Sequence, residues 1–288
     1  MRPPAATPVA LTRDHPEWKP WLALLAEARR ALDDPLWARA VPADSRGAAP
    51  SSPGPAPLLH AARLTVDRNG TDRFLRRLFE VAGNGGESAA TLRAAARSEH
   101  LDVPALLEAA IRQDARCLDD WAAGLGVEPV VLRAVVAVAA TPLLHACRRA
   151  WQDRLPAGWR QGYCPVCSAW PTLAEARGLE RSRRLRCARC GGDWRTDWLR
   201  CPYCDNADHA RLGALVADAP LETRRVETCE ACRGYVKSIA TLRATPPDEV
   251  TLVDLDTVEL DIAALEHGYA RPDEPAYVMR TRVVAADP

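Results

Sequence analysis

Four short motifs of the pattern Cys-x-x-Cys decide how the second half of this chain folds. They read CPVC at 164–167, CARC at 187–190, CPYC at 201–204 and CEAC at 229–232, and they hold eight of the ten cysteines. A two-residue gap lets a tight turn direct both sulfurs at one point, and two such turns complete a tetrahedral site of four thiolates. We therefore predict two metal sites in this part of the chain.

The order of the motifs indicates which of them share a site. CPVC and CPYC each open a unit that runs to a second cysteine pair with a glycine close behind it, Gly191 or Gly234. The gap is 19 residues in the first unit, inside the window of zinc-ribbon-like sites, and 24 in the second. The predicted ligands of the first site are Cys164, Cys167, Cys187 and Cys190, and those of the second are Cys201, Cys204, Cys229 and Cys232.

Clustered thiols can also form disulfides or redox-active motifs. Disulfides suit an exported chain, but the first 20 residues carry charges and prolines where a signal peptide has its apolar core. Redox-active Cys-x-x-Cys motifs normally occur singly, on a βαβ scaffold that the sequence does not indicate. We therefore expect metal binding in a cytoplasmic protein, where thiols stay reduced. The spacing does not name the metal, because four thiolates suit both iron and zinc.

Chain length and net charge further limit the class of protein that this sequence can encode. A chain of 288 residues suggests two domains. The 38 basic and 38 acidic side chains cancel, so no overall field attracts nucleic acid or an anionic membrane. The longest uncharged apolar stretch, between Arg133 and Arg148, has 14 residues, fewer than the about 20 that span a bilayer. We expect it to be a buried helix and expect no membrane insertion.

Apolar residues at helical spacing predict a helical domain over 1–160. The expected helices cover 17–32, 71–82, 88–98, 103–123 and 128–155, the last kinked or broken at Pro142. The stretch 41–57, rich in proline, glycine, serine and alanine, predicts a flexible segment. This half has no phosphate-loop or nucleophile-elbow motif, and its histidines are scattered singly. We expect no enzymatic activity.

The sequence after the last cysteine pair predicts a strand over 235–244 and then an acidic closing helix within 247–274. Its apolar stripe is expected to comprise Leu255, Val258, Ile262, Leu265 and Tyr269, with the acidic side chains on the outer face.

An arginine cluster at 181–200 has two interpretations. It is either a solvated face that offsets thiolate charge or a basic nucleic-acid surface with Trp194, Trp198 and Tyr203 for stacking. We favour the first because the rest of the chain has no matching basic stripe. His209 is expected to be a loop residue rather than a ligand, since eight cysteines already fill two sites.

The motifs, taken in their order along the chain, resemble those of the formate dehydrogenase accessory proteins. The resemblance covers roughly 160–272. It rests on YCPVC at 163–167, LRCARC at 185–190, RCPYC at 200–204, ETCEAC at 227–232 and EHGYAR at 266–271. Two positions depart from the family pattern, because Ser168 and Arg233 stand where a glycine commonly follows the cysteine pair. Either residue could change the conformation of the turn that it follows, but neither is a metal ligand.

The resemblance implies a non-enzymatic, cytoplasmic maturation factor of respiratory formate dehydrogenase. Such a protein contacts the catalytic subunit before export and carries rubredoxin-like iron sites. Two metal ions are therefore expected, with iron favoured and zinc the alternative. A zinc-ribbon protein that binds nucleic acid is the alternative function.

The expected fold is an N-terminal all-α domain, two tandem rubredoxin or zinc-ribbon-like modules with four cysteines each, and a short closing helix. The predicted boundaries are 1–160, 161–200, 201–245 and, for the acidic C-terminal segment, 246–288. Arginine and tryptophan are enriched at interface hot spots. The residues expected to contact the partner are Arg181, Arg183, Arg184 and Trp194.

Overall fold

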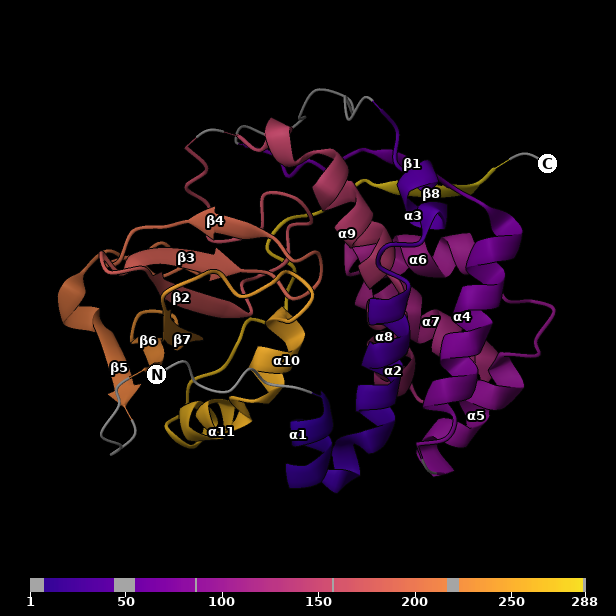
Figure 1. Cartoon of the computed structure of the whole chain (residues 1–288), viewed down its shortest axis with the longest axis horizontal. Coiled ribbons are helices and arrows are strands. Elements are labelled where there is room, and N and C mark those ends of the chain that lie inside the picture. Colours follow the sequence, from indigo (N-terminus) through magenta and orange to yellow (C-terminus); the bar gives the residue numbers. More distant parts are fainter. Residues whose placement is uncertain (1–7, 44–54, 86, 157, 217–222, 287–288) are drawn as a thin grey trace. The chain divides into compact units, whose positions relative to one another are not determined.

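The computed structural model describes residues 8–43, 55–85, 87–156, 158–216 and 223–286. These residues form two compact units (Figure 1). A helical unit comprises the described residues up to Arg154 together with those from Met279 onward, and a sheet unit comprises those from Leu155 to Val278.

The helical unit is built from short helices that pack their apolar faces together. In chain order they are α1 (Pro8–Asp14), α2 (Lys19–Arg30), α3 (Pro35–Ala40), α4 (Arg68–Ala82), α5 (Glu87–Ala95), α6 (Val103–Arg112), α7 (Ala115–Leu125), α8 (Pro129–Ala139) and α9 (Thr141–Ala150). A parallel pair of strands, β1 (Arg63–Val66) and β8 (Arg282–Ala285), joins the two ends of the unit.

Aspartate side chains begin several of these helices. The Asp67 carboxylate accepts a hydrogen bond from the Gly70 amide at 2.6 Å, and Asp102 caps α6 in the same way. Such caps satisfy backbone N–H groups that have no partner within the helix. The prediction of one continuous helix over 103–123 is wrong, because Gln113 adopts a left-handed φ of 58° and ends α6. Asp114 then caps a new helix, α7.

The predicted helix 128–155 is divided near Pro142 into α8 and α9, and the second of these ends at Ala150. The predicted break is confirmed. Together the two helices form an apolar stretch of 22 residues, long enough by composition to cross a bilayer, but most of it is buried inside the protein. Of the predicted flexible segment 41–57, residues 44–54 lie outside the described part of the chain.

The sheet unit is a six-stranded sheet with two helices on one face. The strands are β2 (Leu173–Arg177), β3 (Ser182–Arg186), β4 (Asp193–Arg195), β5 (Leu212–Val216), β6 (Arg224–Cys229) and β7 (Tyr235–Thr241). Their order is β4-β3-β2-β7-β6-β5. Two short helices follow, α10 (Val250–Leu255) and α11 (Val258–Glu266).

Both cysteine units contribute three antiparallel strands to this one sheet. The first supplies β2, β3 and β4, and the second supplies β5, β6 and β7. The halves join through the parallel pair β2 and β7, with Leu173 opposite Lys237. The repeat seen in the sequence is therefore a structural repeat, and its two copies form a continuous sheet.

The C-terminal segment differs from its prediction. The chain turns at Asp256 and Thr257, so the single closing helix becomes two, and the periodicity shifts. Leu260, Ala264 and Tyr269 face Val226 and Tyr235 of the sheet. Ile262 and Leu265 of the expected stripe are exposed instead, so that part of the prediction is wrong.

The predicted segment 246–288 is also divided between the units. Helices α10 and α11 belong to the sheet unit, whereas β8 pairs with β1 in the helical unit. Pairing between residues so far apart in the sequence leaves no local pattern to predict it from.

Candidate metal centres

Each Cys-x-x-Cys motif forms the same tight turn, which we call a knuckle. In each knuckle the backbone N–H of the first cysteine donates to the carbonyl oxygen five residues later. The donor and acceptor pairs are Cys164 and Ala169 (2.9 Å), Cys187 and Gly192 (3.1 Å), Cys201 and Asn206 (2.9 Å), and Cys229 and Gly234 (3.0 Å). Four equal turns place four cysteine pairs in equivalent positions, two in each structural repeat.

The residue directly after each knuckle has a left-handed backbone. These residues are Ser168 (φ 61°), Gly191 (φ 70°), Asp205 (φ 62°) and Arg233 (φ 56°). Glycine adopts this conformation without steric cost, whereas other residues rarely do. Ser168 and Arg233, which depart from the family pattern, therefore keep the turn geometry and accept backbone strain in doing so.

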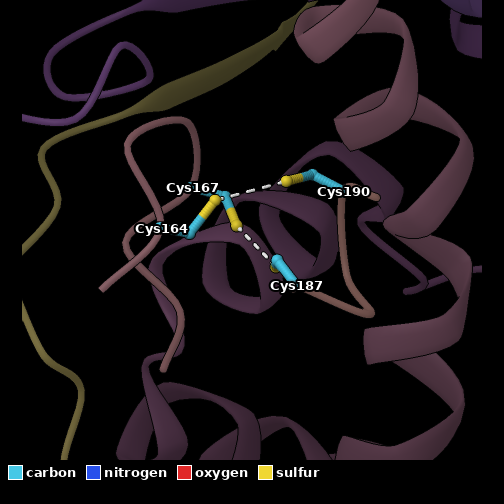
Figure 2. A group of neighbouring side chains, drawn as sticks. All are labelled: Cys164, Cys167, Cys187 and Cys190. Carbon is cyan, nitrogen blue, oxygen red and sulfur yellow. Dashed lines mark hydrogen bonds between the residues drawn. The ribbon is translucent and has the colours of Figure 1, made fainter. Parts of the chain in front are cut away.

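The first cluster consists of Cys164, Cys167, Cys187 and Cys190, whose sulfurs all lie within 4.8 Å of one another. Figure 2 shows the four side chains converging from two loops. The Sγ atoms of Cys164 and Cys190 are 3.4 Å apart, and those of Cys167 and Cys187 are 3.5 Å apart. All four side chains are fully buried.

The second cluster consists of Cys201, Cys204, Cys229 and Cys232. Its Sγ separations are 3.7 Å between Cys201 and Cys232 and 3.7 Å between Cys204 and Cys229. Cys201 and Cys229 are buried, whereas Cys204 and Cys232 are exposed. The cysteines meet in the pairing that the motif order predicts, and exposed His209 is in neither group.

These dimensions fit a tetrahedral metal ion. An ion about 2.3 Å from each of four thiolates keeps the sulfurs about 3.8 Å apart. The separations in the second cluster match that value, and those in the first are a few tenths of an ångström shorter. Each cluster could therefore hold one ion, with four thiolate ligands suited to iron or zinc.

The cysteine thiols within one cluster differ in pKa. Hydrogen bonds with Cys164, Cys167 and Cys190 lower the pKa of Cys187 well below its usual value. Burial raises the pKa of the Cys164 thiol well above its usual value, and it raises the pKa of Cys232 to about 11. Without a cation such thiols stay protonated at neutral pH. A bound metal ion reverses this preference because it stabilises the thiolates that coordinate it. Metal binding at either cluster is therefore coupled to proton release.

Two glycines allow the knuckles to pack closely. A Cβ at Gly192 would lie 3.0 Å from the Cys164 sulfur, so a larger residue would press on the first cluster. A Cβ at Gly162 would lie 1.7 Å from the carbonyl oxygen of Pro202, inside the third knuckle. Gly162 lies two residues before Cys164 of the first knuckle. The close approach to Pro202 therefore connects the two metal modules.

Two of the four side chains expected to contact a partner are buried, so their predicted exposure is wrong. Arg183 is 2% exposed. It donates to the Glu227 carboxylate from Nε and Nη2 and to the Asp197 carbonyl from Nη1. Trp194 is also buried, and its indole donates to the Gln161 carbonyl oxygen. Both side chains hold the strands and loops around the clusters together.

The other two predicted contact residues reach the surface. Arg181 is exposed at the turn between β2 and β3, and its carbonyl accepts a hydrogen bond from the Trp198 indole. Arg184 is partly exposed and forms an ion pair with Asp193. Neither residue belongs to a cysteine cluster.

The sheet unit also contains a buried charge cluster that no sequence pattern indicates. Lys237 is fully buried, and its Nζ lies 2.6 Å from a carboxylate oxygen of both Asp254 and Asp261. Arg271 pairs with the same two carboxylates. The expectation that these acids face outward is wrong, because they neutralise two cations. Burial, with a hydrogen bond to Asp261, raises the pKa of Tyr235 to about 12.

Fold and site together define a class: a metal-binding protein with a helical unit and one sheet that carries two clusters of four cysteines. Proteins called "Protein FdhE homolog" share stretches of this sequence. The one from Aquifex aeolicus is 31% identical over 116 residues, which is 39% of this chain and 40% of the relative. The one from Stutzerimonas stutzeri is 31% identical over 114 residues, or 38% of this chain and 36% of the relative. The chain thus matches well under half the length of these relatives.

The fold has a solved counterpart in the crystal structure of the FdhE protein from Pseudomonas aeruginosa. The TM-score is 0.57, the sequence identity is 21%, and the match covers 95% of this chain and 93% of that one. No family model matches the sequence. The resemblance to the formate dehydrogenase accessory protein family, seen in the cysteine motifs, is confirmed by these relatives.

Proposed function

We propose that this protein is a non-enzymatic, cytoplasmic maturation factor of respiratory formate dehydrogenase that binds the catalytic subunit and carries two metal ions. The single observation that carries the proposal is the pair of four-cysteine clusters in a chain similar to the FdhE proteins. The four thiolates of each cluster fill a tetrahedral coordination sphere. A metal site closed in this way stabilises the fold and leaves no open position for substrate.

Iron is the metal that we propose for both clusters, in a rubredoxin-like arrangement of four thiolates. The openings CPVC and CPYC, which are similar to those of rubredoxin, support iron, whereas the sulfur separations of 3.4–3.7 Å fit either metal. When bound, iron would add one-electron redox chemistry that zinc lacks. The residues of the chain would hold the ion and shield it from water, most completely in the first cluster, where all four sulfurs are buried.

For the partner surface, Arg181 is the predicted contact residue that the structure supports best. It is exposed, and so is Leu179, two residues before it, at 89%. Leu199, 64% exposed, follows Trp198, whose indole donates to the Arg181 carbonyl oxygen. Exposed apolar side chains beside an arginine have the composition of a protein interface. Arg184 lies nearby, but its guanidinium is already engaged by Asp193.

The nucleic-acid alternative loses its main support. Within the arginine cluster, Arg183 pairs with Glu227, Arg184 with Asp193, and Arg200 with Asp205. Arg186 pairs with the fully buried Glu175. Guanidinium groups neutralised in this way contribute little to the release of counterions from a phosphate backbone.

The proposal is tested in a bacterial strain that lacks its own accessory protein of this kind. We expect the chain to restore formate dehydrogenase activity and the catalytic subunit to co-purify with it. Arg181→Glu should weaken co-purification while the metal content stays unchanged. Arg116→Glu, at an exposed position in the first turn of α7, is the matched control and should have no effect. Full-length protein that holds both metals but neither restores activity nor retains the subunit would refute the proposed role.

A further inference from the structure

The two clusters differ in how solvent reaches them. All four sulfurs of the first cluster belong to side chains with 0% exposure. In the second cluster, Cys204 and Cys232 are exposed. One comes from each knuckle, so solvent meets the second cluster on two of its four ligands.

A cavity also lies next to the two buried ligands of the second cluster. A cavity of about 160 Å³ lies within the sheet unit, and Cys201 and Cys229 are part of its wall. The rest of the wall includes Trp198, Tyr203 and the strand residues Leu212 to Ala214. Water and small solutes therefore have space next to the two cysteines that the surface does not expose.

The knuckle that carries Cys204 has a buried side and an exposed side. On the buried side, Tyr203 donates to the Tyr235 carbonyl oxygen at 2.7 Å. On the exposed side it is held by an ion pair. The residue after it, Asp205, pairs with Arg200, and the two side chains are 67% and 37% exposed. Exposed ion pairs add little rigidity because water and salt screen them. The first knuckle, in contrast, has buried residues throughout 164–169. Local opening requires less free energy where fewer buried contacts must break.

We propose that the second four-cysteine site is an exchange site, from which a metal ion passes to a competing thiolate ligand, and that the first is a permanent structural site. This inference rests on the proposed metal binding. In the first exchange step an incoming thiolate forms a bond to the metal, and the bond from the metal to Cys204 or Cys232 breaks. The same substitution at the other three cysteines completes the transfer. The released thiolate takes a proton from water, and the metal keeps its oxidation state.

The test uses the full chain loaded with two zinc ions and a chromophoric chelator, 4-(2-pyridylazo)resorcinol, in excess. We expect one zinc ion to leave at least about tenfold faster than the other, a difference of about 1.4 kcal/mol in activation free energy. In parallel, N-ethylmaleimide is added to the loaded protein and its attachment is mapped by mass spectrometry. Cys204 and Cys232 should react before any cysteine of the first cluster.

Two variants show which cluster releases zinc in the fast phase and which releases it in the slow phase. Cys204→Ser should remove the fast phase and leave the slow one. Cys167→Ser changes the equivalent cysteine of the other CPxC knuckle, and it should remove the slow phase and leave the fast one. If Cys167→Ser does not fold, the order of alkylation in the unmodified chain decides the question alone.

Equal release rates for both ions, or earlier alkylation of the first cluster, would overturn the exchange site while leaving two metal centres in place. A chain that takes up fewer than two zinc ions gives a different result, because it refutes the proposed metal centres themselves. The two failures are therefore distinguishable.

Discussion

The guanidinium of Arg233 lies over the ring of Tyr269, with its Cζ 4.0 Å from the ring centroid. The same side chain donates hydrogen bonds to the carbonyl oxygens of His267, at 2.6 Å, and Gly268, at 3.3 Å. Arg233 directly follows the fourth knuckle. Its left-handed backbone is thus balanced by contacts that attach the end of α11 to the second metal module.

Replacing Arg233 with glycine should loosen that attachment. The substitution relieves a left-handed conformation worth about 1–3 kcal/mol, but it removes two charge-assisted hydrogen bonds and a cation–π contact. We expect faster amide hydrogen exchange over 258–271 in the metal-loaded protein. Asp205→Gly relieves the same strain after the third knuckle, and it should leave the exchange of 258–271 unchanged. Equal protection in wild type and Arg233→Gly would show that the arginine does not hold the helix.

Lys237→Met should destabilise the sheet unit strongly. The substitution keeps the length of the side chain but leaves the carboxylates of Asp254 and Asp261 with Arg271 as their remaining cation. Breaking a buried ion pair by removing one partner costs about 3–5 kcal/mol. Urea unfolding of the metal-loaded protein measures the loss.

The chain offers a matched control for that measurement, because its only other lysine is Lys19, which is exposed at the start of α2. Lys19→Met should change the free energy of unfolding by no more than about 0.5 kcal/mol. A similar small effect for Lys237→Met would mean that the charge cluster does not stabilise the sheet unit.

Gly162→Ala should disturb the packing of the two metal modules. The added methyl group would overlap the carbonyl oxygen of Pro202, and backbone atoms must move to relieve the clash. Overpacking of this kind costs about 1–3 kcal/mol. We expect lower metal retention at the second cluster, measured as zinc released on dialysis.

Gly124→Ala is the comparison, since a Cβ at this position in α7 meets no atom within 4 Å. It should stabilise the protein by about 0.5–1 kcal/mol, because alanine favours a helix over glycine. Normal metal retention in Gly162→Ala would show that the two modules tolerate a wider separation.

Local patterns predicted the features that depend on local physics. The knuckle pairing follows from motif order and loop length, and the break near Pro142 follows from the lost amide hydrogen. The end of α6 at Gln113 did not follow, because the left-handed residue there is not glycine and the preceding apolar pattern continues into α7.

Burial of charged side chains was the main source of error. Arg183 and Lys237 look like surface residues in the sequence, and each is buried because a carboxylate elsewhere in the chain lies opposite it. Glu227 is 44 residues from Arg183, so no local pattern connects the two. The pairing of β1 with β8 is hidden for the same reason.

The colour of the protein distinguishes the proposed iron from zinc. Four thiolates around oxidised iron give charge-transfer absorption in the visible range, whereas zinc thiolate sites are colourless. We expect protein purified without oxygen from its native cells to be reducible and to regain visible absorption on oxidation. A colourless preparation that contains only zinc would exclude electron transfer at these sites.

Elemental analysis of the full chain tests most directly whether the eight clustered cysteines hold two metal ions. Metal content per chain, measured by mass spectrometry of acid-digested protein, should be two for the wild type. It should be one for the Cys201→Ser, Cys204→Ser double variant, because two thiolates do not complete a tetrahedral site. A wild-type chain with no bound metal, or a double variant that still holds two ions, would show that the two clusters are not the metal sites.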